Sequence, residues 1–113
     1  MQKIKQIADK MVFLKLIDVV ENNIEKKDYE AGIERLAVFD DKKLPPFKRH
    51  NIYFLRGKIH YLRGRYDLAI NHLFKLVKED FEFPDAFLYL GKSYESLGLD
   101  EKAKWAFARV NPK

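Results

Sequence analysis

Residues 57–100 read GKIHYLRGRYDLAINHLFKLVKEDFEFPDAFLYLGKSYESLGLD, and within this stretch the sequence begins to repeat. The repetition has a fixed offset of 34 residues and continues just beyond residue 100. The pairs that share the offset are Gly57 with Gly91, Gly64 with Gly98, Ala69 with Ala103, and Leu73 with Phe107. A constant offset in this range is typical of stacked helical repeats.

Two of these glycines interrupt patterns that otherwise predict helix. A glycine inside a helix costs about 1 kcal/mol relative to alanine, so a glycine that recurs at the same place indicates a packing requirement. We expect close approach of two helices, with Gly57 facing Ala69 and Gly91 facing Ala103, twelve residues further on.

Composition limits the classes of protein. The chain has 113 residues, 47% of them hydrophobic, which suits one domain with a packed core. It has no cysteine, which excludes disulfides and thiolate metal sites. The most apolar N-terminal run, residues 11–20, is broken by Lys15 and Asp18 and is too short for a membrane span or a signal peptide. We expect no membrane association, and a cytoplasmic protein or a part of a larger one.

The net charge of +5 is unevenly distributed. Residues 42–66 contain no acid and eight basic residues, which are Lys42, Lys43, Lys48, Arg49, Arg56, Lys58, Arg63 and Arg65. Residues 79–85 contain four acids and no base. The basic stretch is either an anion-binding surface or a solvated helix face balanced by neighbouring acids, and we favour the second interpretation.

Apolar spacings of three and four residues predict six helices and no strand. We expect them at residues 3–26, 29–39, 47–63, 66–79, from Pro84 to the residue before Gly98, and 100–110. Residues before Met11 are either part of the first helix or a separate extension. Asp28 and Asp100 are expected as N-caps, Gly64 as a left-handed C-terminal cap, and Pro112 as the stop of the last helix. The six helices would form three hairpins.

The strings YFLRG (53–57), GRYDLAI (64–70) and FLYLGKSY (87–94), followed by Gly98 and Ala103, resemble the tetratricopeptide repeat (TPR). KDYEAGI (27–33) matches the same family more weakly, so the first repeat is degenerate. The chain departs from the usual pattern at His60 and at Arg63, which we expect on an exposed edge.

The resemblance covers residues 13–112 and implies an all-α fold, a right-handed superhelical stack of three antiparallel helix hairpins (an α-solenoid). It implies a single domain over residues 1–113, with repeats at 13–46, 50–83 and 84–112. Residues 1–12 would be an N-terminal extension or the start of the first helix.

The resemblance further implies a concave groove that binds a peptide or protein segment, without enzymatic activity. The groove residues would be Ile17, Glu21, Asn51, Phe54, Lys58, Tyr61, Asp85, Leu88, Lys92 and Glu95. The alternative is that Phe54 and Leu88 only pack against the neighbouring repeat. The partner would be acidic and apolar. Family members that hold a terminal carboxylate need cations at positions that here carry Ile17, Glu21, Leu55, Asp85 and Tyr89, so we do not expect that specialisation.

No motif for catalysis, a cofactor or a metal is found. His50, His60 and His72 lack the spacing of a metal set, and His60 is expected as half-buried core. Asp40 and Asp41 are expected to serve a turn rather than acid–base chemistry.

Two other functions remain as alternatives to the groove. Trp105, Phe107 and Val110 have no following helix to cover them, so we expect that they face inward, that they form an edge that pairs with another copy of the chain, or that the chain is part of a longer protein. Such an edge would make a homo-oligomeric scaffold. Electrostatic binding of nucleic acid by the basic stretch ranks below both, because no nucleic-acid motif accompanies it.

Overall fold

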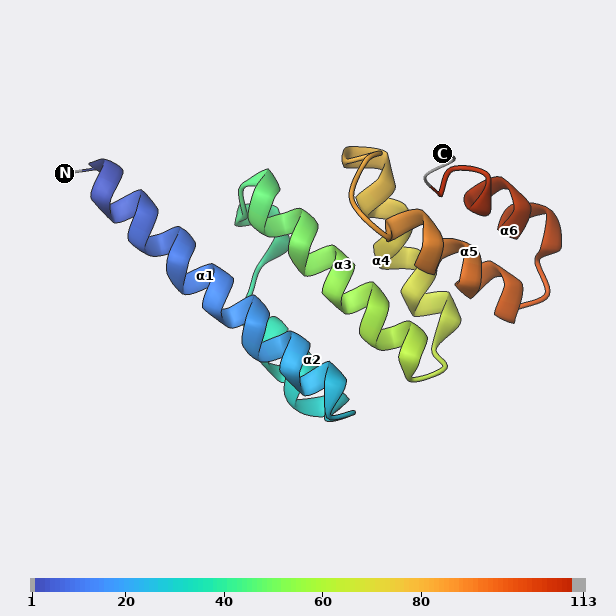
Figure 1. Cartoon of the computed structure of the whole chain (residues 1–113), viewed down its shortest axis with the longest axis horizontal. Coiled ribbons are helices and arrows are strands. Elements are labelled where there is room, and N and C mark those ends of the chain that lie inside the picture. The colour runs from blue at the N-terminus through green and yellow to red at the C-terminus, as the bar shows by residue number, and fades with distance from the viewer. Residues whose placement is uncertain (1, 111–113) are drawn as a thin grey trace.

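The computed structural model describes residues 2–110, and this part of the chain is all-helical, with no strand (Figure 1). Six α-helices are present, as expected, together with one short 3₁₀ helix. They are α1 (Gln2–Glu25), α2 (Tyr29–Leu36), η1 (Asp41–Lys43), α3 (Pro46–Leu62), α4 (Tyr66–Glu79), α5 (Ala86–Ser96) and α6 (Asp100–Phe107). The expected stop at Pro112 lies outside the described residues.

The turns after α3 and α5 are closed by glycine in the same way. Gly64 and Gly98 have φ angles of 77° and 76°, in the left-handed region where a side chain is disfavoured. The Gly64 N–H donates to the Tyr61 carbonyl (3.0 Å), and the Arg65 N–H donates to the His60 carbonyl (2.8 Å). Equivalent bonds recur 34 residues later, at Gly98 and Leu99. This is the Schellman motif, and it confirms the C-terminal cap expected at Gly64.

Lys27 takes the place of the glycine in the turn after α1. Its φ angle is 60°, and its N–H donates to the Ile24 carbonyl at 3.0 Å. The next N–H, of Asp28, donates to the Asn23 carbonyl at 2.8 Å, which completes the same motif. The Asp28 side chain then accepts from the Ala31 N–H at 3.3 Å, so the expected N-cap is confirmed. The first turn therefore keeps the geometry of the other two without their glycine.

Four helix boundaries differ from expectation, and one of them is the end of α6, which lies at Phe107 rather than near residue 110. α2 ends at Leu36 rather than near Phe39. α5 begins at Ala86 and not at Pro84, because Asp85 adopts a left-handed φ of 65° that redirects the chain. Asp100 is the first residue of α6, and Leu99 is its N-cap.

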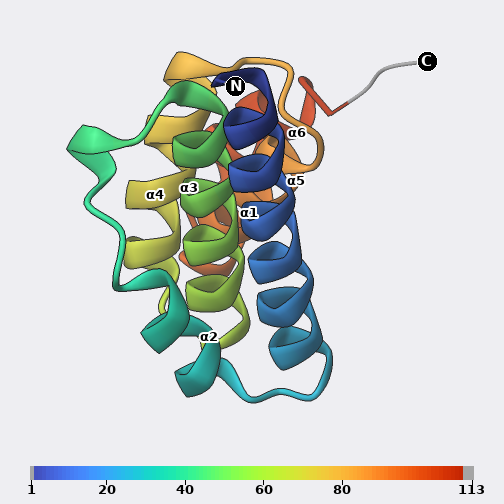
Figure 2. The same ribbon diagram turned by 90° about the vertical axis from the view of Figure 1, so that its left-hand side faces the viewer.

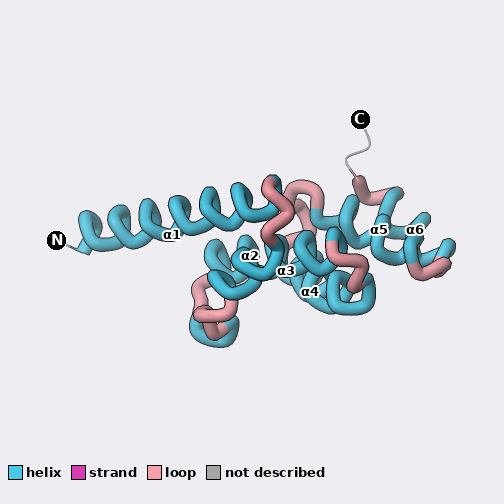
Figure 3. The backbone as a smooth tube through the Cα atoms, turned by 90° about the horizontal axis from the view of Figure 1, so that it is seen from below, coloured by secondary structure: helices cyan, strands magenta, loops and turns pink. Residues whose placement is uncertain are grey.

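α1 is one continuous helix from Gln2, so residues 2–12 are not a separate extension (Figures 1 and 3). None of the helices within residues 2–110 is long and apolar enough to cross a bilayer.

Consecutive helices contact each other along the chain, and α3 also contacts α1 and α5 (Figures 1 and 2). The buried residues form two clusters. One includes Val20, Leu36 and Ile52 from the first three helices, and the other includes Leu73 and Leu90 from the last four. The half-buried ring of Phe54 on α3 packs against both clusters and joins them.

The atoms nearest to a Cβ added at Gly57 or Gly91 belong to large side chains and not to the alanines that we expected. A Cβ on Gly57 would lie 2.5 Å from Cγ of Leu73, and a Cβ on Gly91 would lie 2.6 Å from a ring atom of Phe107. Leu73 and Phe107 lie one helical turn beyond Ala69 and Ala103. The close approach itself is present, but the glycine makes room for a bulky residue of the next helix.

Arg56 connects the long α2–α3 segment to α3. Its guanidinium donates to the Leu36 carbonyl at the end of α2 (2.9 Å) and forms an ion pair with Asp41 in η1. Both carbonyl and carboxylate therefore have a charged donor, which makes these hydrogen bonds stronger than neutral ones. Asp41 serves the turn, as expected.

Replacing Lys27 with glycine is expected to stabilise the protein. A residue other than glycine in the left-handed region costs about 1–2 kcal/mol, and glycine removes this cost while adding some entropy to the unfolded chain. Lys27→Gly should therefore raise the free energy of unfolding by about 1 kcal/mol, measured by urea denaturation. Lys26→Gly, which removes the same charge without a positive φ, is the control and should not stabilise. A decrease on Lys27→Gly would contradict this account of the turn.

Candidate interaction surface

Tyr89 on α5 is the centre of an aromatic group between α3 and α5. Its ring lies 5.8 Å from that of Phe54 and 5.6 Å from that of Tyr61, both edge-on. The ammonium groups of Lys58 and Lys92 lie 5.6 and 5.4 Å from the centroid of the Tyr89 ring. Cation–π contacts at this distance hold both lysines beside the aromatic group.

A pocket of about 420 Å³ adjoins this group near the N-terminal ends of α3 and α5. Phe54 and Phe83 line it, with their rings 5.2 Å apart. The polar lining includes three carboxylates, from Glu21 on α1, Asp80 after α4 and Asp85 before α5. The pocket therefore combines aromatic walls with an acidic rim. We call the aromatic group and this pocket together the α3–α5 surface.

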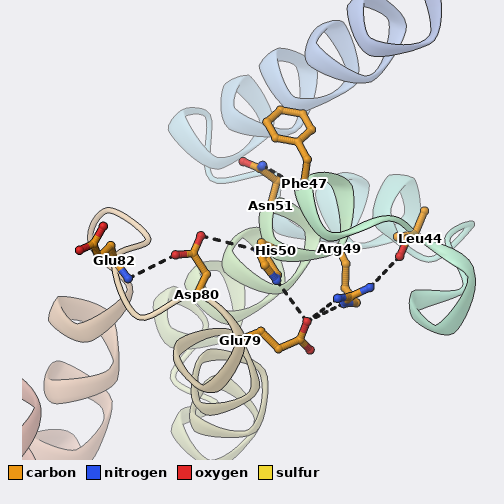
Figure 4. A network of polar contacts seen from close by, with 8 residues as sticks. All are labelled: Leu44, Phe47, Arg49, His50, Asn51, Glu79, Asp80 and Glu82. Carbon is orange, nitrogen blue, oxygen red and sulfur yellow. Dashed lines mark hydrogen bonds and ion pairs between the residues drawn. The ribbon is translucent and has the colours of Figure 1, made fainter. Parts of the chain in front are cut away.

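A polar network lies beside the pocket (Figure 4), and two of its members, His50 and Asp80, line it. Nε2 of His50 lies 3.1 Å from Glu79, and Nδ1 lies 3.6 Å from Asp80. The Arg49 guanidinium donates to the same Glu79 carboxylate and to the Leu44 carbonyl at 2.7 Å. These contacts fix the end of α4 against the start of α3.

The Arg49 hydrogen bond, aided by that of His50, holds the pKa of the Glu79 carboxyl below its usual value. Glu79 is therefore ionised at neutral pH and already has charged partners. In contrast, Glu21 and Asp85 form no ion pair among residues 2–110, so their charges face the pocket.

The structure places the residues predicted for the groove in several groups. Glu21, Asn51, Phe54 and Asp85 line the same pocket. Lys58, Tyr61 and Lys92 surround Tyr89. Leu88 lines a neighbouring pocket with Phe81 and Val110, Ile17 packs against the first core cluster, and Glu95 is exposed at the far end of α5.

Phe54 fits both interpretations of its sequence pattern. It packs against Phe83 and Tyr89, as the packing alternative requires, and it also lines the pocket. Tyr89 is not among the residues predicted for the groove, although it is one helical turn from Lys92. Phe83 was missed too, because only the folded α4–α5 connection brings it to α3, and His50 of α3 was missed because its partners Glu79 and Asp80 come from the end of α4.

The basic stretch is partly neutralised by acids from other segments. Arg49 pairs with Glu79, Arg56 with Asp41, and Arg63 with Glu30 at 3.8 Å. Arg63 is half-buried and does not lie on an exposed edge as expected. These pairs favour the interpretation of a balanced helix face over that of an anion-binding surface.

No protein-family model matches the chain, and no curated protein or solved structure matches it either.

His60 and His72 stack between α3 and α4, with ring centroids 5.4 Å apart and planes within 9° of parallel. His60 is half-buried, as expected. Nδ1 of each ring is buried without a hydrogen-bond partner among the described residues. Burial lowers the pKa of both imidazoles, and that of His72 falls to about 4, with smaller contributions from His60, Arg56 and Lys75. No group of three or more metal-ligating side chains occurs within residues 2–110.

The histidine pair is expected to make the fold sensitive to acid. An unfolded histidine binds a proton near pH 6.5, whereas His72 in the folded protein does so near a pKa of about 4. The stability associated with neutral His72 is therefore present above about pH 6.5 and is lost as the pH falls towards 4. When the pH falls from about 7 to about 5, the melting temperature of the His72→Phe variant should therefore drop less than that of the wild type. Equal losses in the two proteins would contradict the burial of a neutral ring.

Proposed function

We propose that the protein is a non-enzymatic interaction module that binds an extended peptide segment of a partner protein on the α3–α5 surface. The observation that carries the proposal is the aromatic group around Tyr89, which lies between an acidic pocket and two lysines. Exposed clusters that combine aromatic side chains with flanking charge are typical of interaction hot spots.

The proposed architecture is a TPR-like, right-handed superhelical stack of three hairpins. The three equivalent Schellman turns and the offset of 34 residues support it. The contacts of α3 with α1 and with α5 support it as well, because they bring the first helices of successive hairpins together. In this arrangement the α3–α5 surface lies on the concave side of the stack.

Charge on the surface suggests what the peptide carries. Asn51 on α3 and Asp85, which immediately precedes α5, lie at the acidic end, and Lys58 on α3 and Lys92 on α5 each follow seven residues later. Seven residues of helix span about 10 Å, which three extended peptide residues also span. We therefore propose a segment with a basic residue for the pocket, an apolar residue against Phe54 and Tyr89, and an acidic residue near the lysines. The acidic and apolar parts of this segment agree with the partner expected from the sequence, and the basic residue is new.

The backbone of Asp85 gives further support. A left-handed φ at a residue other than glycine is strained, and such strain is concentrated at functional sites. Here it directs the chain so that Asp85 lies at the rim of the pocket.

Self-assembly through the C-terminal edge has less support. The Phe107 ring packs over Gly91 on α5 and so faces inward. Trp105 packs edge-on against Phe87 and is covered by the Arg109 guanidinium, 4.3 Å from its ring. Trp105 stays 40% exposed, so these contacts cover only part of the edge.

Selection from a displayed library of random peptides tests the proposal. The enriched peptides should carry a basic and an acidic residue on either side of an apolar one. The double substitution Lys58→Glu/Lys92→Glu should weaken binding of the best synthetic peptide at least tenfold, or about 1.4 kcal/mol, by fluorescence anisotropy. Asp85→Lys should weaken it comparably.

The matched control is Lys75→Glu/Lys78→Glu, which makes the same charge change at exposed positions of α4. It should leave affinity within about twofold, because the Debye length of about 8 Å screens remote charges. Equal weakening by both double variants, or none by either, would reject the α3–α5 surface as the binding site. Circular dichroism verifies that each variant is folded.

A further inference from the structure

The N-terminal half of α1 projects beyond the other helices (Figures 1 and 3). Val12 in this segment is 68% exposed. Four other large apolar side chains are exposed too, with relative exposures of 72% for Ile4, 61% for Ile7, 56% for Met11 and 42% for Leu14. They follow one another at spacings of three, four and three residues, so they share one face of the helix. We call them the α1 stripe.

The α1 stripe is not the face that α1 uses for folding. Phe13, Val20 and Ile24 are the buried residues of α1, and they share a different face. At about 100° per residue, the centre of the α1 stripe lies roughly 140° around the helix from that buried face. Packing within the chain therefore does not explain the stripe. A contiguous exposed apolar patch of this kind marks an interaction site.

The spacing of the α1 stripe selects the kind of partner. Ile4 and Met11 take the a positions of a heptad, and Ile7 and Leu14 take the d positions. This is the pattern of a helix that packs along a second helix. Residues 4–14 span about 16 Å, or three helical turns, which is enough for a short two-helix contact.

Lysines border the α1 stripe. Lys3 and Lys10 occupy the g positions on one side, and Lys15 occupies an e position on the other. Asp9 is the only acid among residues 3–15, and it lies at an f position on the far side of the helix. The Lys10 ammonium is held 4.9 Å from the ring centroid of Phe47, so this flank is anchored to α3.

These lysines argue against a second copy of the chain as the partner. A parallel pair would place Lys10 opposite Lys15, and an antiparallel pair would place Lys3 opposite Lys10. Like charges at e and g positions disfavour pairing, whereas carboxylates on the partner would favour it. A membrane surface fits less well. The α1 stripe has no aromatic residue, and the a position that follows it is occupied by Asp18.

We propose that the α1 stripe binds an amphipathic helix of another protein whose apolar seam is bordered by Glu or Asp. This site is separate from the α3–α5 surface and does not depend on the function proposed there.

The test uses a fluorescein-labelled peptide of three heptads with Leu at a and d and Glu at e and g. Its glutamates prevent it from pairing with itself. Fluorescence anisotropy should show binding with a Kd of about 10 μM or tighter at low ionic strength, weakened by salt. A peptide with Lys in place of every Glu should bind at least tenfold more weakly.

Two variants locate the contact. Ile7→Asp/Met11→Asp should weaken binding of the Glu peptide at least tenfold. Val38→Asp, at a 78%-exposed apolar residue after α2, is the matched control and should have no effect. Lys58→Glu/Lys92→Glu should also bind the Glu peptide normally, which separates this test from that of the α3–α5 surface.

Four results would overturn the proposal. They are no binding of the Glu peptide, equal binding of both peptides, a dimer in sedimentation that Ile7→Asp abolishes, and binding to phosphatidylserine vesicles without binding to the peptide. The substituted residues are exposed, so thermal melting should show folded variants.

Discussion

The structure depends on the close approach of paired helices at points where one of the two helices carries a glycine, which has no side chain. Leu73 of α4 occupies the space beside Gly57 of α3, and Phe107 of α6 occupies the space beside Gly91 of α5. Leu73 is fully buried, so it cannot move aside for an added methyl group. The glycines lose about 1 kcal/mol of helix propensity each, and the burial of a large apolar side chain offsets this loss.

This constraint also positions the α3–α5 surface. Gly57 lies on α3 between Phe54 and Tyr61, and Gly91 lies on α5 between Tyr89 and Lys92. The face of each helix that bears the glycine packs against the next helix. Phe54 and Tyr61 lie elsewhere on α3, where their rings pack against Tyr89 of α5. The first helix pair differs, because its glycine, Gly32, lies on α2 and contacts Ile59 of α3. There Arg56 and its carbonyl and carboxylate partners hold the α2–α3 connection.

Sequence patterns predicted the number and type of helices because their signals are local. Asp28 and Gly64 are caps whose chemistry depends only on adjacent residues. Leu73 was not predicted as the nearest neighbour of Gly57, since a repeat offset gives equivalent positions but not the register at which two helices cross. Pro84 was predicted as the first residue of a helix that would include Asp85. No local sequence signal predicts the left-handed backbone of Asp85. Tyr89 and Phe83 meet α3, and His50 of α3 meets Glu79 and Asp80, only through tertiary packing, so the sequence alone did not identify them.

The most direct test is a double-mutant cycle between Gly57→Ala and Leu73→Ala, in which urea denaturation measures the free energy of unfolding of each variant. The account predicts that Gly57→Ala lowers the free energy of unfolding by about 1–3 kcal/mol in the wild-type background, because the new methyl group overlaps Leu73. With Leu73→Ala already present, the same substitution should cost nothing or stabilise by up to about 1 kcal/mol. Stabilisation by Gly57→Ala in both backgrounds would contradict the claim that this glycine exists to let α3 and α4 meet.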